Sequence, residues 1–271
     1  MDKIPPYDIE KIYLKNYNNE TRNIILSNFK KYTKLKEFYC YGCDLNELPD
    51  LPNSLKYLDC SNNKLKKLPD LPNLLTHLYC YINNLRELPN LPTLLIYLEC
   101  SRNYLKKLPN LPYSLTRLVC SCNKLKELPN LPNLLTYFKC IHNNLTELPK
   151  LPNSLIILLC NHNRLIKLPY LPNSLDLLRC HNNKLTELPD LPKSLTELCC
   201  IYNPLIYQDI DIKTINKINL KNKIIKRMKL LNRTLLLEHS AMITMNPKRI
   251  QRLLDNLEID FFDGSFDTLT I

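Results

Sequence analysis

Cysteine is the residue whose type and spacing most invite a chemical role in this sequence. Nine of the twelve cysteines follow one another at intervals of twenty residues: Cys40, Cys60, Cys80, Cys100, Cys120, Cys140, Cys160, Cys180 and Cys200. Thiols can form disulfides, bind metals or act as nucleophiles. A fixed interval instead places each thiol at the same point of one repeated unit. We therefore expect a column of reduced cysteines, because stacked coils lie about 4.8 Å apart whereas bridged Cβ atoms lie near 3.8 Å.

Two other groups of residues have metal-ligand chemistry. Cys40 and Cys43 form a CxxC pair, but the repeat itself sets both positions, so packing is the favoured role. His142 and His162 share one repeat position, which Cys122 also occupies in an earlier copy, and His181 lies one place earlier in the next copy. Because no carboxylate accompanies this column in register, we expect solvated histidines and no metal site.

The composition argues against catalysis. The chain has only two glycines, so the glycine-rich loops that bring backbone close to phosphates are absent from the sequence. Paired catalytic carboxylates and a nucleophilic triad are not recognisable. We expect a protein that is not an enzyme and that needs no cofactor.

The repeated unit is defined by its apolar residues, one asparagine and two prolines. One copy contains Leu55, Leu58, Cys60, Asn63, Leu65, Leu68, Pro69, Leu71 and Pro72. Apolar residues at the first, fourth, sixth and eleventh positions with Asn or Cys at the ninth are the leucine-rich repeat pattern. Eight full copies begin at Leu35, Leu55, Leu75, Leu95, Leu115, Leu135, Leu155 and Leu175, and a ninth that begins at Leu195 ends after Pro204.

The stretch LPDLPNSLKYLDCSNNKLKKLPDLP resembles the short, proline-containing leucine-rich repeats of bacterial effectors. The composition is also similar to that of uncharacterised repeat proteins of giant DNA viruses. The resemblance covers about two thirds of the chain and implies a solenoid. Some bacterial relatives carry a ubiquitin ligase domain with a nucleophilic cysteine, but no cysteine follows Cys200 here, so we expect no ligase activity.

The pattern also predicts how each copy folds. Residues 57–61 alternate between apolar and polar, which indicates a strand, and stacked copies then make a parallel sheet on the concave face. The ninth-position asparagines should form a buried ladder. Pro69 and Pro72 disfavour helix in the return path, so the convex face should be extended or polyproline-like.

The segments outside the array are expected to be helical caps. We assign residues 1–34 to an N-terminal cap, with a helix between Asn19 and Lys31, residues 35–204 to the array and residues 205–271 to a C-terminal cap. Such lids are needed because the end coils of a solenoid expose their apolar sides.

The third, fifth and seventh positions of each copy vary, and in the first four copies they are rich in tyrosine. Tyrosine provides a large contact area with a polar group, which suits protein recognition. We predict a protein-binding site on the concave face made of Tyr39, Tyr41, Tyr57, His77, Tyr79, Tyr81, Tyr97 and Glu99. The alternative is that tyrosine only fills strand positions that it favours.

Two further functions remain open. Pro6, Asp8, Ile9 and Ile12 resemble the start of an F-box, which would make the protein a substrate adaptor of a cullin-type ubiquitin ligase. The segment 213–233 carries six basic residues between Lys217 and Lys229 without an acidic one, in a chain of net charge +11, and would contact nucleic acid. A solvated helix face explains it better, so nucleic acid is disfavoured as a partner.

The N-terminus bears on localisation. Residues 1–10 lack the basic opening and apolar run of a signal peptide, and no apolar stretch of about eighteen residues occurs. We therefore expect an intracellular, cytoplasmic monomer, in its own cell or in a host, with no membrane contact.

Overall fold

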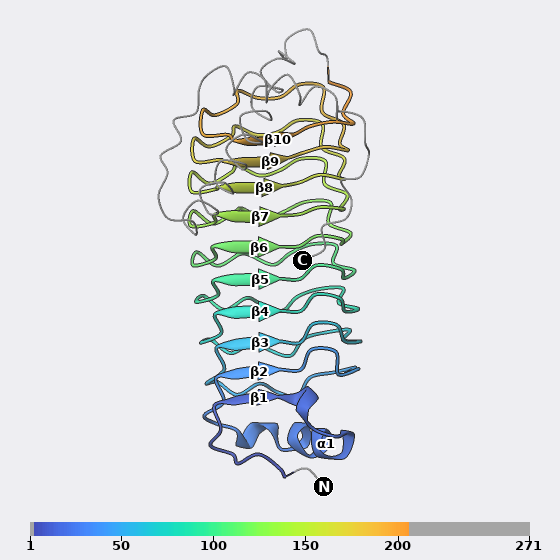
Figure 1. The fold of residues 1–271 in the computed structure, drawn as a ribbon, viewed down its shortest axis with the longest axis vertical. Coiled ribbons are helices and arrows are strands. Elements are labelled where there is room, and N and C mark those ends of the chain that lie inside the picture. The colour runs from blue at the N-terminus through green and yellow to red at the C-terminus, as the bar shows by residue number, and fades with distance from the viewer. Residues whose placement is uncertain (1–2, 206–271) are drawn as a thin grey trace, which may run out of the picture. The chain divides into compact units, whose positions relative to one another are not determined.

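The computed structural model describes residues 3–205, in which ten short strands form one parallel sheet in chain order (Figure 1). The first strand, β1, covers Lys11–Tyr13 and precedes the repeats. The others recur at the same point of each copy: β2 Glu37–Tyr39, β3 Tyr57–Asp59, β4 His77–Tyr79, β5 Tyr97–Glu99, β6 Arg117–Val119, β7 Tyr137–Lys139, β8 Ile157–Leu159, β9 Leu177–Arg179 and β10 Glu197–Cys199. Each repeat therefore contributes one strand and one coil of a solenoid.

Neighbouring strands pair in a register displaced by one whole repeat. Tyr57 of β3 lies opposite His77 of β4, and Leu58 lies opposite Leu78. The middle residue of β3 is buried and the residues on either side are partly exposed. Successive side chains on a strand point to opposite faces, so this alternation confirms the predicted strand.

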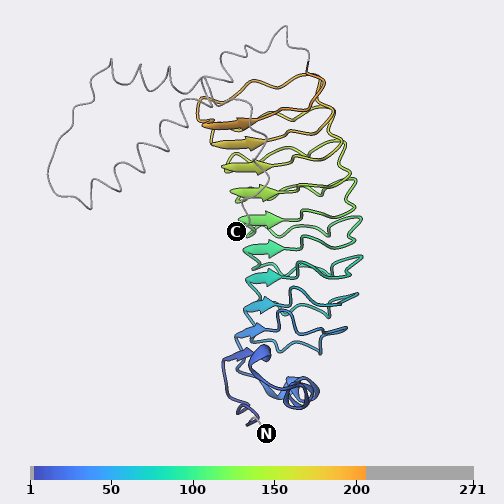
Figure 2. The same ribbon diagram turned by 45° about the vertical axis from the view of Figure 1, so that its right-hand side comes forward.

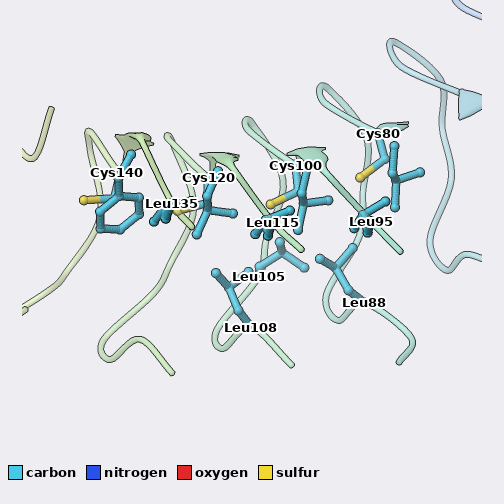
Figure 3. Packing of buried hydrophobic residues seen from close by; sticks show 14 of the residues in the cluster. Cys80, Leu88, Leu95, Cys100, Leu105, Leu108, Leu115, Cys120, Leu135 and Cys140 are labelled. Carbon is cyan, nitrogen blue, oxygen red and sulfur yellow. The ribbon is translucent and has the colours of Figure 1, made fainter. Parts of the chain in front are cut away.

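The core consists of columns of equivalent side chains that run along the array. In the coil that begins at Leu55, the side chains of Leu55, Leu58, Cys60 and Leu65 are fully buried, and the next coil repeats the pattern. Figure 3 shows cysteine and leucine side chains of successive coils packed in the interior. All twelve cysteines lie in the described part of the chain and all are free thiols, which confirms the reduced column.

A second column, of asparagine side chains at the ninth position, ties the backbones of adjacent coils together. The Asn83 amide nitrogen donates to the carbonyl oxygens of Cys60 (3.0 Å) and Cys80 (3.2 Å), one in each of two coils. Its side-chain oxygen accepts the N–H of Leu65 at 3.0 Å. The same pattern recurs from Asn63 to Asn203. The predicted asparagine ladder is therefore confirmed.

The residue before the ninth position of each coil, which is Cys43 in the first coil and a ladder asparagine in the others, has a left-handed backbone. In the first coil this residue is Gly42, with φ of +62°. The later coils place side chains there, with φ between 52° and 55°: Asn62, Ile82, Arg102, Cys122, His142, His162, Asn182 and Tyr202. Residues other than glycine enter this region at a cost of roughly 1–2 kcal/mol each. The pairing of adjacent coils must offset that cost at every copy.

The return path from the sheet contains no helix between Cys40 and Leu205. Figure 2 shows the strands along one side of the stack and the return loops on the other. In each coil a tight turn closes the path, as where the Leu55 N–H donates to the Pro52 carbonyl at 3.1 Å. The prediction that the convex side of the coils contains no helix is confirmed for residues 40–205.

The segment before the first repeat packs against its open side. Helix α1, Asn19–Ser27, lies within the predicted helical stretch and is flanked by the short 3₁₀ turns η1, Leu14–Asn16, and η2, Phe29–Lys31. The ring of Phe29 lies 4.5 Å from that of Phe38 in the first coil, and both are buried. The prediction of a C-terminal cap falls on residues 206–271, outside the described residues.

Strand β1 was not expected. Ile12, one of the residues of the F-box resemblance, is its central residue, is 1% exposed and lies opposite Phe38 of β2. This side chain therefore belongs to the core of the sheet.

The asparagine ladder can be tested with two adjacent residues. Each of the two cysteine carbonyls that Asn83 binds, those of Cys60 and Cys80, has a second amide donor from a neighbouring asparagine, but the buried Leu65 N–H has only Asn83. We expect Asn83→Ala to lower the free energy of unfolding by about 2–4 kcal/mol, because it leaves a buried donor without a partner. Urea denaturation followed by circular dichroism measures this.

The matched control is Asn84→Ala. Asn84 is exposed and its side chain takes no part in the ladder. Its substitution should change stability by less than about 0.5 kcal/mol. Equal losses for the two variants would show that the amide ladder does not hold the coils together.

Candidate functional site

The solvent side of the strands, formed by the third, fifth and seventh positions of each coil, is here called the sheet face. A three-residue strand places its first and third side chains on this face and its middle side chain in the core. Because strands are stacked in register, equivalent side chains of neighbouring coils lie one strand spacing apart, about 4.8 Å. The sheet face is therefore a set of side-chain rows along the array.

Aromatic rings fill the first half of this face. The ring centroids of Tyr13 and Tyr39 lie 4.5 Å apart, and those of Tyr39 and Tyr57 lie 4.8 Å apart. Tyr57 in turn contacts Tyr79 at 5.2 Å, and Tyr79 contacts Tyr97 at 4.7 Å. These distances are those of favourable aromatic pairs. We call this continuous row of five tyrosines, which extends from β1 to β5, the aromatic ladder.

The predicted site residues lie together on the sheet face. Tyr39, Tyr57, Tyr79 and Tyr97 belong to the ladder. His77 lies beside it, with its ring 5.7 Å from Tyr57 and 6.2 Å from Tyr97. Tyr41 and Tyr81 form a separate pair whose ring centroids lie 6.3 Å apart. Glu99 accepts a hydrogen bond from the Tyr97 hydroxyl at 3.1 Å.

The ladder continues beyond the predicted residues at both ends. Tyr13 of β1 stacks on Tyr39, and Lys11 lies over both rings, at 5.1 and 5.0 Å. At the other end the Arg117 guanidinium lies between Tyr97 (5.6 Å) and Tyr137 (4.5 Å). Tyr137 and Arg117 occupy the third position of their coils, so the repeat register was the signal that could have found them.

Burial, together with hydrogen bonds, raises the pKa of three ladder phenols, Tyr39, Tyr57 and Tyr97, and keeps them protonated. The Tyr39 hydroxyl donates to Glu37 at 2.9 Å, and burial together with this bond raises the pKa of Tyr39 to about 12. Burial and then the neighbouring Tyr79 raise the pKa of Tyr57 well above its usual range. Every such hydroxyl can donate a hydrogen bond at neutral pH.

Two carboxylates on this face differ in their environment. Lys11 forms an ion pair with Glu37 at 2.7 Å, and this contact lowers the pKa of Glu37. Burial raises the pKa of Glu99, although the Tyr97 hydroxyl bond acts in the opposite direction. Neither carboxylate is paired with a second one in a way that would support acid and base catalysis.

The second half of the sheet face is different. It begins with Lys139, continues with the partly exposed aliphatic residues Ile157, Leu159 and Leu177, and ends with Arg179, which pairs with Glu197 at 2.6 Å. Such exposed pairs contribute little to stability.

The histidine column is a stack and not a chelating group. The rings of His142 and His162 lie 4.0 Å apart and nearly parallel, and His181 meets His162 edge on at 5.3 Å. In residues 3–205 no three histidine, cysteine, aspartate or glutamate side chains come together in a way that would hold a metal ion. Over the same residues, no helix is long and apolar enough to cross a bilayer.

Several solved structures with a similar architecture come from bacterial proteins. No family model and no curated protein sequence matches this chain. YopM from Yersinia enterocolitica is 41% identical over 64% of this chain and 39% of its own length, with a TM-score of 0.62. The leucine-rich repeat domain of a Shigella effector is 31% identical over 62% of this chain and 78% of that domain, with a TM-score of 0.53. This chain belongs to the leucine-rich repeat proteins.

A third solved structure bears on the thiols. The functional domain of InlJ from Listeria monocytogenes, described as including a cysteine ladder, is 30% identical over 71% of this chain, with a TM-score of 0.58. This leucine-rich repeat chain spans 44% of the InlJ chain and 39% of the Yersinia enterocolitica YopM chain. The predicted likeness to bacterial effectors is supported by the Yersinia and Shigella neighbours. The likeness to giant-virus proteins stays a prediction.

The burial of the cysteine column predicts a large contrast in thiol reactivity. Burial raises the pKa of Cys160 to about 12, so almost no reactive thiolate forms at pH 8, and the side chain is also shielded from reagents. Cys122, at the left-handed corner, is partly exposed. Iodoacetamide should label Cys122 at least a hundredfold faster than any cysteine of the column, as measured by peptide mass spectrometry.

The control for this experiment is the same labelling in urea, where all twelve thiols should react at similar rates. Fast labelling of several column cysteines in the folded protein would contradict the packed core.

Proposed function

We propose that this protein is a non-catalytic interaction module that binds a protein partner on its sheet face, through the tyrosines of the first four coils. The observation that carries the proposal is the aromatic ladder, which forms one continuous surface of rings and hydroxyl groups. Tyrosine is enriched among the residues that dominate protein binding energies. The likeness to leucine-rich effector proteins supports the same role.

The ladder is already ordered before a partner arrives. Each ring packs against its neighbours, so its rotamer is fixed, and binding then loses little side-chain entropy. Stacking uses the faces of the rings, which leaves their edges and hydroxyl groups for the partner. The Tyr39 and Tyr97 hydroxyls already donate to Glu37 and Glu99, so their oxygens remain as acceptors for backbone N–H groups of a partner that lies over this row.

Charges on the sheet face give the bound partner an orientation. Asp59 and Glu99 make the tyrosine half acidic, whereas Arg117, Lys139 and Arg179 place positive charge from β6 onwards. Complementary charge steers a partner into one register more than it adds affinity.

The compartment of this partner follows from the thiols. Cys122 and Cys199 are partly exposed free thiols, and such thiols persist in a reducing environment. We therefore propose that the partner is met in a cytoplasm, that of the cell of origin or of a host.

The proposal is tested by removing tyrosine side chains without disturbing the coils. In Tyr57→Leu, Tyr79→Leu and Tyr97→Leu, three rings of the ladder are removed, and each new residue is one that another coil carries at the same position, as Leu177 and Leu159 do. We expect the triple variant to lose at least 90% of the proteins that the intact chain captures from cytosol, measured by quantitative mass spectrometry.

The control variant changes three exposed tyrosines away from the sheet face: Tyr113→Asn, Tyr170→Asn and Tyr202→Asn. Other coils carry asparagine at each of these positions. This variant should keep the captured proteins. Equal capture by both variants, at equal folded fraction by circular dichroism, would refute binding through the tyrosine face.

A further inference from the structure

A groove lined by basic residues lies on the loops that follow the strands of four consecutive coils. A hollow of about 830 Å³ is lined by Lys66, Asn84, Arg86, Tyr104, Lys106 and Lys124. A second hollow of about 410 Å³ shares Asn84 and Tyr104 with it and adds Arg102. We call the two together the basic groove.

No acidic side chain of residues 3–205 pairs with the cations of the groove. Within residues 3–205, none of Lys66, Arg86, Lys106 and Lys124 makes an ion pair, and no acidic side chain lines either hollow. Lys124 instead lies over the ring of Tyr104, 4.9 Å from its centroid. The positive charge is therefore available to a ligand.

The repeat shows that folding does not require this charge. The twelfth position carries the groove cations Lys66, Arg86 and Lys106, and Lys126 continues this row of four in the next coil, where Lys124, from the tenth position, is the residue that lines the hollow. Equivalent positions in other coils carry Asn46, Thr146, Ile166 or Thr186. Like charges on adjacent strands or coils repel one another. A run of four cations that the fold can do without indicates a role in binding an anion.

The spacing of the cations fits a polymer better than a single small anion. Successive coils lie about 4.8 Å apart, so four coils extend over about 14 Å. Phosphates follow one another at about 3.4 Å along a stacked strand, so this length matches roughly four nucleotides. Tyr104, which is 47% exposed, lies in the middle of the groove, where its ring offers a surface on which a base can stack.

We infer that the basic groove binds single-stranded nucleic acid, with phosphates along the cation row and a base against Tyr104. A protein partner with acidic side chains would pair with the cations but would make no use of the Tyr104 ring that lies among them. The groove is separate from the sheet face, so this inference does not depend on the proposed function. It also differs from the prediction for residues 213–233, which lies outside the described residues.

The experiment measures binding of a fluorescent ten-nucleotide oligothymidylate to the full chain by anisotropy, over a range of salt concentrations. The groove variant is Lys66→Thr, Arg86→Thr and Lys106→Thr, where threonine is the residue of two later coils. We expect at least a tenfold rise in Kd. The slope of log K against log salt should fall in magnitude by about 2, since each phosphate contact contributes about 0.7.

A second variant separates stacking from charge. Tyr104→Asn introduces the residue that Asn84 and Asn144 provide at the same position. We expect it to weaken binding about tenfold without changing the salt slope, because base stacking is not an ionic contact.

The matched control removes three exposed cations that do not line the groove, in Lys150→Asn, Arg164→Asn and Lys184→Asn, again with residues found at the same positions of other coils. The inference is overturned if this control loses as much affinity as the groove variant, or if the groove variant binds like the intact chain. It is also overturned if polyglutamate of equal charge displaces the oligonucleotide as well as unlabelled oligothymidylate does, since the groove would then accept any acidic polymer.

Discussion

The array depends on one interaction, the asparagine amide that bridges two coils. Its nitrogen donates to the cysteine carbonyls of its own and the preceding coil, and its oxygen accepts a leucine N–H of the preceding coil. These groups leave the strand at a sharp corner and are buried, so no water can satisfy them. The same bridge offsets the left-handed backbone of the residue before each asparagine. Without it, neither the corner nor the strand register would persist.

The surface follows from the register that this bridge maintains. Because neighbouring strands lie one strand spacing apart in fixed register, a tyrosine at the fifth position of one coil and a tyrosine at the third position of the next come within stacking distance. The centroids along the ladder lie 4.5–5.2 Å apart. The same spacing aligns cations on the loops, where the side chains are exposed and water weakens the repulsion between like charges. One backbone arrangement thus supports a row of tyrosines on the strands and a row of cations on the loops.

Much of this could be predicted from the sequence, because a twenty-residue period fixes which side chains are equivalent. The cysteine column, the strand positions and the asparagine ladder all follow from it. Strand β1 could not be predicted, since it precedes the repeats and pairs at a different interval, Lys11 with Glu37. The basic groove was missed for another reason: its residues lie on loops, where alternation does not tell which side chains converge.

The register also limits how such a chain can change in length. One residue added between two corners would turn the strand that follows by half a period, so that its leucine would face water and its tyrosine the core. Tolerated insertions and deletions must therefore come as complete coils. Duplication of a coil would copy its binding side chains together with their spacing. The recognition surface would therefore grow or shrink by one coil at a time, whereas point mutations would change its chemistry.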